Sequence, residues 1–82
     1  MEAQMKEFIE YIAKHLVDNP ENVHVEENRD GEKSVQLVLK VQQEDVGKII
    51  GRKGRTVQAM RTLLTAIAAK EGLKSGLDII EK

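Results

Sequence analysis

The chain has 82 residues, of which 40% are hydrophobic and 33% charged, so it can bury one core and we expect a single domain over residues 1–82. It contains no cysteine, which excludes disulfides, thiolate nucleophiles and cysteine-ligated zinc. Its first residues form no basic n-region or apolar h-region, and no apolar run is long enough to span a membrane, so we expect a cytoplasmic protein with no membrane contact. The net charge of −1 hides two unlike halves, because residues 1–45 carry 5 basic and 11 acidic side chains and residues 46–82 carry 8 basic and 3 acidic ones.

The first predicted element is an amphipathic helix over residues 4–17. Its apolar side chains recur at the spacing of one helix face, and they are Met5, Phe8, Ile9, Ile12 and Leu16. Asn19-Pro20 follows this segment, and a proline disfavours helical geometry at the residue before it. The helix should therefore end near Asp18.

A β-hairpin is predicted next. Val23 and Val25 alternate with polar residues, and the Asp30-Gly31 step favours a tight reversal of the chain. Residues 35–41 then alternate apolar and polar side chains, which is typical of a strand with one buried face. The two strands should pair in antiparallel fashion.

Two helices are predicted in the second half of the chain. Glu44 and Asp45 suit the start of a short helix over residues 46–50, where acidic groups complement the helix dipole. A longer helix is predicted from about Arg55 to Glu71. The apolar residues expected on its buried face are Val57, Met60, Leu63, Leu64, Ile67 and Ala68.

A third strand is predicted near the end of the chain, where Leu77, Ile79 and Ile80 lie. The element order is then α-β-β-α-α-β. This order predicts an α+β fold with a three-stranded sheet and three helices packed on one face.

The segment between the two helices of the second half carries the most informative pattern. Gly51 and Gly54 are three residues apart and permit a turn too tight for residues with a Cβ. The amides at the start of the following helix favour an anion, and Arg52, Lys53 and Arg55 add positive charge around them. We therefore predict that this loop binds phosphate.

Two other phosphate-binding motifs fail on spacing. A P-loop needs G-x-x-x-x-G-K-[ST], and counting from Gly47 or Gly51 puts Arg52 or Thr56 where its second glycine should be. A dinucleotide fingerprint needs G-x-G-x-x-G directly after a strand, and Ile49 stands two residues before Gly51. The sequence therefore gives no motif for nucleotide hydrolysis or for dinucleotide binding.

Residues 49–57, IIGRKGRTV, resemble the I-I-G-x-x-G-x-x-[IV] signature of the KH domain family. In that family the GXXG loop clamps the backbone of about four nucleotides of a single strand. The order α-β-β-α-α-β is that of the prokaryotic, type II arrangement, so the resemblance covers nearly the whole chain. It implies a non-catalytic protein that binds single-stranded RNA. Small bacterial proteins of this kind are thought to self-associate and to pair with a larger protein that carries a KH domain.

The resemblance also implies roles for the residues around the loop. Arg52 and Lys53, at the tip, would face the sugar-phosphate backbone, and Arg61 would touch a base edge or a further phosphate. Gly47 would let another backbone approach the short helix closely. The complete set expected to bind RNA is Gly47, Lys48, Ile50, Gly51, Arg52, Lys53, Gly54, Arg55, Thr56, Val57 and Arg61.

The outer side of the long helix is poor in charge for a surface that faces solvent. Its residues there are Ala59, Thr62, Thr65, Ala66 and Ala69. Small uncharged residues let another helix approach closely, so we expect this alanine-rich face to form a two-fold homodimer.

Other functions remain as alternatives. The chain could be an adaptor that binds proteins through the alanine-rich face and keeps a vestigial loop, or it could bind single-stranded DNA. A helix-turn-helix that binds duplex DNA is disfavoured by the acidic first half. No nucleophile–base pair or cofactor fingerprint is present, and His15 and His24 lack the spacing of metal ligands, so we expect no enzyme and no metal or cofactor site.

Overall fold

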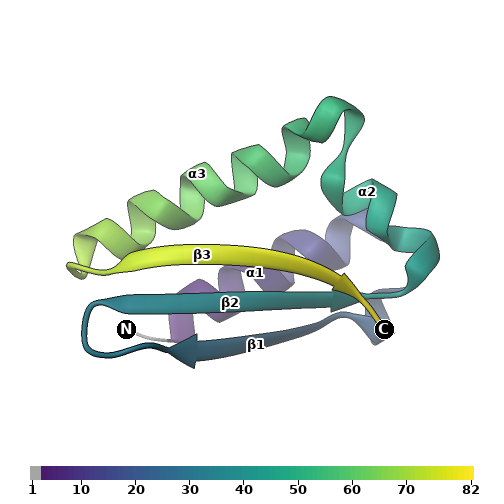
Figure 1. Cartoon of the computed structure of the whole chain (residues 1–82). Coiled ribbons are helices and arrows are strands. Elements are labelled where there is room, and N and C mark those ends of the chain that lie inside the picture. The colour runs from purple at the N-terminus through teal and green to yellow at the C-terminus, as the bar shows by residue number, and fades with distance from the viewer. Residues whose placement is uncertain (1–2) are drawn as a thin grey trace.

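The structure is a computed structural model, and it describes residues 3–82. The helices and strands, in chain order, are α1 (Ala3–Leu16), β1 (His24–Arg29), β2 (Ser34–Val41), α2 (Val46–Ile50), α3 (Arg55–Lys70) and β3 (Lys74–Glu81). This order is the predicted one, and each predicted helix and strand is present (Figure 1). Within this described range, no helix combines the length and the apolar character needed to cross a membrane.

The three strands form one mixed sheet in the order β1-β2-β3. β1 and β2 are antiparallel, with Val25 opposite Leu39, whereas β3 runs parallel to β2, with Leu77 opposite Leu37. The turn between β1 and β2 contains Gly31 at φ +78°, a conformation that glycine adopts without strain. The predicted hairpin and the predicted third strand are therefore both confirmed.

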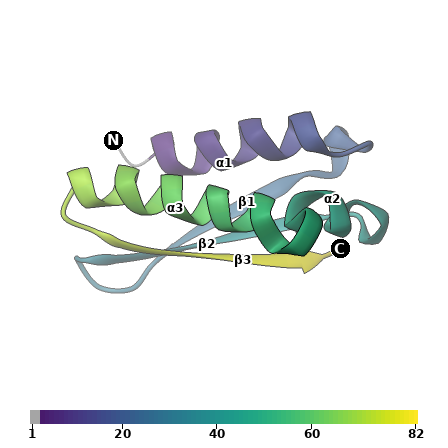
Figure 2. The same cartoon turned by 90° about the horizontal axis from the view of Figure 1, so that it is seen from above.

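All three helices lie on one side of the sheet, with α1 and α3 side by side over it and α2 at one end (Figure 2). The alternation along β2 decides which face they cover, because every second residue from Val35 to Val41 is buried and those between are partly exposed. The buried residues that the helices add to this core are Met5, Ile9, Ala13, Ile49, Met60, Leu64 and Ala68. The sheet and the three helices thus form a two-layer α+β fold, and these helices leave the other face of the sheet uncovered.

The prediction for one residue of α3 is wrong, because Leu63 does not belong to the buried face. Leu63 is 49% exposed, whereas Val57, Met60, Leu64 and Ala68 are buried. At 100° per residue, Leu63 lies about 100° around the helix from the middle of that buried stripe. Leu63 is therefore apolar and adjacent in sequence to the buried Leu64, but its side chain does not face the sheet.

Candidate nucleic-acid interface

The connection between α2 and α3 is a tight turn made by residues 51–54. Gly51 has φ +78°, Lys53 has φ +58° and Gly54 has φ +74°, all in the left-handed region that residues with a Cβ rarely adopt. The amide of Gly54 donates to the carbonyl of Gly51 at 3.1 Å and closes the turn. Two consecutive left-handed residues therefore lead directly into α3.

The two glycines of the turn are needed for different reasons. A Cβ on Gly51 would lie 2.2 Å from Oγ1 of Thr56, so that position is closed by a neighbouring side chain as well as by its φ. A Cβ on Gly54 would meet nothing within 4 Å, so there only the left-handed φ requires glycine. The open surroundings of Gly54 leave the main chain accessible on that side.

The start of α3 presents main-chain amides. The first amides of an α-helix have no carbonyl partner within the helix, and together they carry the positive end of its dipole. Arg55 satisfies its own amide with the carbonyl of Arg52. Among the described residues no side chain caps this helix start, so the amides that follow Arg55 are left for an external acceptor.

Three cations surround this helix start. Arg52, Lys53 and Arg55 are all exposed. None of the ion pairs found between described side chains involves them. Their charges are therefore available to an anion that approaches the turn.

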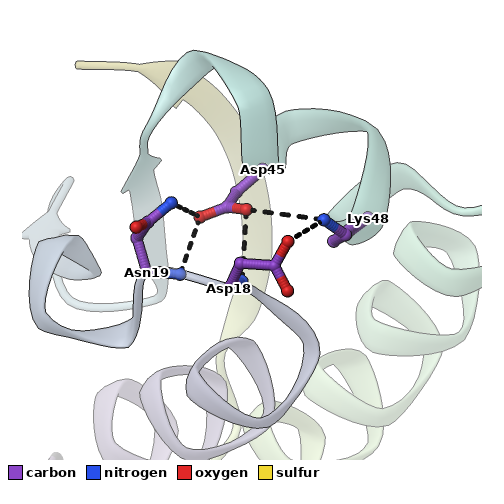
Figure 3. Close-up of polar contacts among 4 residues, drawn as sticks. All are labelled: Asp18, Asn19, Asp45 and Lys48. Carbon is purple, nitrogen blue, oxygen red and sulfur yellow. Dashed lines mark hydrogen bonds and ion pairs between the residues drawn. The ribbon is translucent and has the colours of Figure 1, made fainter.

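Lys48, which belongs to the set expected to bind RNA, points into an acidic cluster (Figure 3). Its Nζ donates a hydrogen bond to Oδ2 of Asp18 and lies 3.9 Å from Oδ1 of Asp45. The hydrogen bond with Asp18, together with the nearby carboxylate charges, raises the pKa of Lys48. Lys48 therefore differs from the three cations at the tip, because its charge already has partners within the chain.

Asp45 lies at the centre of this cluster and is fully buried. Its Oδ1 accepts a hydrogen bond from the backbone amide of Asp18 at 3.2 Å, and its Oδ2 accepts from the backbone amide and Nδ2 of Asn19, both at 3.1 Å. Burial by itself raises the pKa of the Asp45 carboxyl, but these hydrogen bonds and the charge of Lys48 outweigh burial and hold the pKa below its ordinary value. We call Asp18, Asn19, Asp45 and Lys48 the α1–α2 clip.

The clip gives Asp45 a role that the sequence did not predict. Asp45 directly precedes α2, as expected, but its carboxylate makes no capping hydrogen bond to that helix. Its partners follow α1 and lie 26 and 27 residues away in the chain. No local pattern signals them, because two of the three donors are backbone amides.

Arg61, the most distant residue of the predicted set, contacts the edge of the sheet. Its Nε and Nη2 donate to the carbonyl of Leu77 in β3 at 3.2 and 3.0 Å. A pocket of about 380 Å³ lies between α3 and β3, lined by Gln36, Arg61, Leu64, Thr65, Ser75, Gly76, Leu77 and Asp78. Within residues 3–82, the Oγ of Ser75 is buried there without a hydrogen-bond partner. The sequence analysis missed this pocket, since it forms only when β3 is placed beside α3.

The remaining predicted residues divide between core and surface. Val57 is buried, whereas Ile50 is 39% exposed next to the turn. Gly47 has open space around it, because a Cβ there would meet nothing within 4 Å. The five residues of the alanine-rich face, Ala59, Thr62, Thr65, Ala66 and Ala69, are all exposed.

Comparison with known proteins identifies similar chains along nearly the whole length. Residues 6–79 match the family model described as "KhpA/KhpB, KH domain". Three relatives carry the name "RNA-binding protein KhpA". The one from Clostridium perfringens is 54% identical over 93% of this chain and 100% of its own. Those from Chlamydia trachomatis and Aquifex aeolicus are 47% and 46% identical, over 95% and 94% of this chain and 99% and 96% of their own.

Proposed function

This chain belongs to the KhpA/KhpB family of KH domains, and from that premise we propose that it is a non-catalytic protein that holds single-stranded RNA at the α2–α3 turn. The observation that carries the proposal is the turn itself. Residues 51–54 present main chain beside the uncapped start of α3, and three exposed cations without an ion pair among the described residues stand around it. Main chain open in this way accepts a phosphodiester, because no side chain keeps the strand at a distance.

The neighbouring surfaces give the rest of the strand somewhere to lie. Ile50 offers an exposed apolar side chain beside the turn, on which a base can rest. Gly47 leaves the surface of α2 bare, which supports its expected role in close backbone approach. The pocket between α3 and β3 adds the guanidinium of Arg61 as a group that can hydrogen-bond to a base edge.

Binding at this surface should depend moderately on salt. If Arg52, Lys53 and Arg55 each neutralise one phosphate, the slope of log K against log salt for a single strand is about −2. A site for about four nucleotides binds weakly by itself, and linking two such sites raises the affinity without new contacts. Affinity useful in a cell therefore calls for a second KH domain.

We propose that the second KH domain docks on the alanine-rich face, either as a second copy of this chain or as part of a KhpB-like protein. The face is exposed and uncharged, and the family description itself joins KhpA with KhpB. An adaptor that uses only this face is the second candidate function, with the cytoplasm as the proposed compartment for either. The RNA-binding function requires the α2–α3 turn, whereas the adaptor function does not.

Reversing the charge at the tip of the turn tests the RNA-binding proposal. The variant Arg52→Asp with Lys53→Asp should lose binding of labelled single-stranded RNA in fluorescence anisotropy. Its circular dichroism and melting temperature should stay close to those of the wild type, since both side chains are exposed.

Lys6→Asp with Lys33→Asp is the matched control. Both lysines are exposed, and the change in net charge is the same. The control should bind RNA about as well as the wild type, because exposed charges beyond a Debye length of about 8 Å are largely screened. Retained binding by the Arg52/Lys53 variant would place the RNA elsewhere. Competition by single-stranded DNA and by duplex tells which nucleic acid the turn prefers.

A further inference from the structure

The four cations around the turn are not equivalent. Arg52, Lys53 and Arg55 have no ion pair among the described residues, whereas Lys48, three residues before Gly51, is paired with Asp18 and lies near Asp45. Figure 3 shows both carboxylates turned toward the same ammonium group. One of the positive charges next to the proposed RNA surface is therefore already compensated by the protein.

The two carboxylates that face Lys48 have different tasks. Asp45 is buried and its oxygens accept hydrogen bonds from the segment after α1, so it is committed to the fold. The side chain of Asp18 is 73% exposed, and its carboxylate contacts Lys48. Asp18 contacts Asp45 through its backbone amide, whereas its side chain contacts Lys48. Replacing the Asp18 carboxylate therefore keeps the hydrogen bonds that join Asp45 to the segment after α1.

An exposed ion pair of this kind is easily exchanged. The side chain of Lys48 is 44% exposed, and pairs in contact with solvent contribute little to stability. A phosphate oxygen and the Asp18 carboxylate are both anionic acceptors, so they compete for the same ammonium. While Lys48 is paired with Asp18, it does not neutralise a phosphate and so displaces no counterion from the RNA. The aspartate also adds a negative charge close to the strand.

We propose that Asp18 is a built-in competitor for the RNA backbone, which withholds Lys48 from phosphate and so sets the affinity of the turn below the value that four free cations would give. This inference rests on the proposed function, since it concerns the same surface. Asp18, in the segment that follows α1, would thus control RNA affinity without contacting RNA. The acidic character of the first half of the chain thereby has a specific consequence at the turn.

The decisive variant is Asp18→Asn, which keeps the backbone amide and removes the charge. Its affinity for single-stranded RNA should rise about two- to fivefold, the gain expected from one exposed charge pair. The slope of log K against log salt should steepen by about 0.7, the contribution of one further phosphate on a single strand. Asp18→Ser serves as a second variant, and both should melt close to the wild type.

A double-mutant cycle with Lys48→Gln isolates the mechanism. In the Lys48→Gln background, Asp18→Asn should leave the salt slope unchanged, because no ammonium is released. A steeper slope that appears without Lys48 would overturn the proposal, since the gain would then come from removing a negative charge alone.

Glu32→Gln is the matched control for charge. Glu32 is exposed in the turn between β1 and β2, at the end of the sheet opposite α2 (Figure 1). The Glu32→Gln variant removes the same charge as Asp18→Asn. It should change neither the affinity for RNA nor the slope of log K against log salt. If the wild type binds RNA through Arg52 and Lys53 but Asp18→Asn matches the wild type, this inference fails alone. If the wild type binds no RNA, the proposed function fails as well.

Discussion

Single residues around the turn show how one amino-acid type serves separate physical needs. Gly51 is required by a left-handed φ and by contact with Thr56, and Gly54 is required by φ alone. Gly47 is required by neither, because it has helical geometry and open space where a Cβ would stand. A glycine within a helix costs about 0.5 to 1 kcal/mol relative to alanine. The stability of the chain alone therefore gives no reason for Gly47.

Alanine substitutions at these positions should consequently act in opposite directions. Gly51→Ala should lower the free energy of unfolding by at least about 1 to 2 kcal/mol, the cost of a left-handed conformation for a residue with a Cβ. Gly47→Ala should raise it by about 0.5 to 1 kcal/mol. Urea denaturation measures both changes.

Gly47→Ala also separates stability from function. We expect weaker RNA binding from this more stable protein, because a methyl group then stands where the strand approaches. An RNA affinity equal to that of the wild type would remove Gly47 from the proposed interface.

Secondary-structure elements are joined near the turn by the α1–α2 clip. Asp45 precedes α2 and receives its hydrogen bonds from Asp18 and Asn19, which follow α1. A buried carboxylate with these donors is stabilised in its charged form. The clip therefore fixes the start of α2, and with it the approach to the turn, relative to α1.

The clip should give the protein a specific sensitivity to acid. The pKa of Asp45 is lowered in the folded state relative to the ordinary 3.8, so its carboxylate stabilises the fold fully above that pH. This contribution is lost as the pH falls below 3.8 toward the folded-state pKa. Asp45→Asn should be less stable at pH 7 and should lose less further stability on acidification. Chemical denaturation at a series of pH values measures this difference.

Glu26→Gln is the comparison for the acid prediction. The hydrogen bond from Lys40 and its charge also lower the pKa of Glu26. That pair is exposed and screened by solvent, so its removal should change the pH profile less than Asp45→Asn does. Equal profiles for the two variants would contradict a special role for the buried carboxylate.

At the scale of the whole molecule, the fold separates two surfaces of α3. One end of the helix carries the turn and its cations, while the exposed side of the helix carries the alanine-rich face, whose Thr65 also lines the pocket beside β3. Because these surfaces do not coincide, two protomers can meet through α3 and still expose both turns. Such an arrangement presents two sites to one RNA strand.

A charge placed on the alanine-rich face should therefore break the proposed dimer. Ala66→Glu should sediment as one protomer at tens of micromolar, where the wild type is expected to sediment as two, because pairing the helices would bury an unpaired carboxylate. Gln43→Glu adds the same charge at an exposed position before α2 and should leave the dimer intact. A wild-type mass of one protomer would end this part of the proposal.

Binding of long and short RNA gives an independent measure of the dimer. Ala66→Glu should lose more affinity for RNA long enough to reach two turns than for RNA that fills one, since only the long strand gains from linked sites. Equal losses for both lengths would mean that the variant disturbs the turn itself.

The sequence by itself determined the elements and the place of the turn. Helical and strand periodicities report on neighbouring residues, so the order α-β-β-α-α-β could be predicted before any packing was known. The spacing of Gly51 and Gly54 likewise depends on local backbone geometry. The error at Leu63 marks the limit of this kind of prediction, because periodicity fixes the width of a buried stripe only approximately.

Only the tertiary structure decided which charges around the turn are free. Lys48 and Arg55 look alike in the sequence, yet packing of α1 beside α2 brings Asp18 to Lys48 and leaves Arg55 exposed. The contact of Arg61 with Leu77 and the pocket beside it arise in the same way, when β3 takes its place next to β2. These contacts join residues far apart in the chain, and several of their partners are backbone groups, which every residue type supplies. Their positions therefore depend on how the layers pack rather than on any local pattern of side chains.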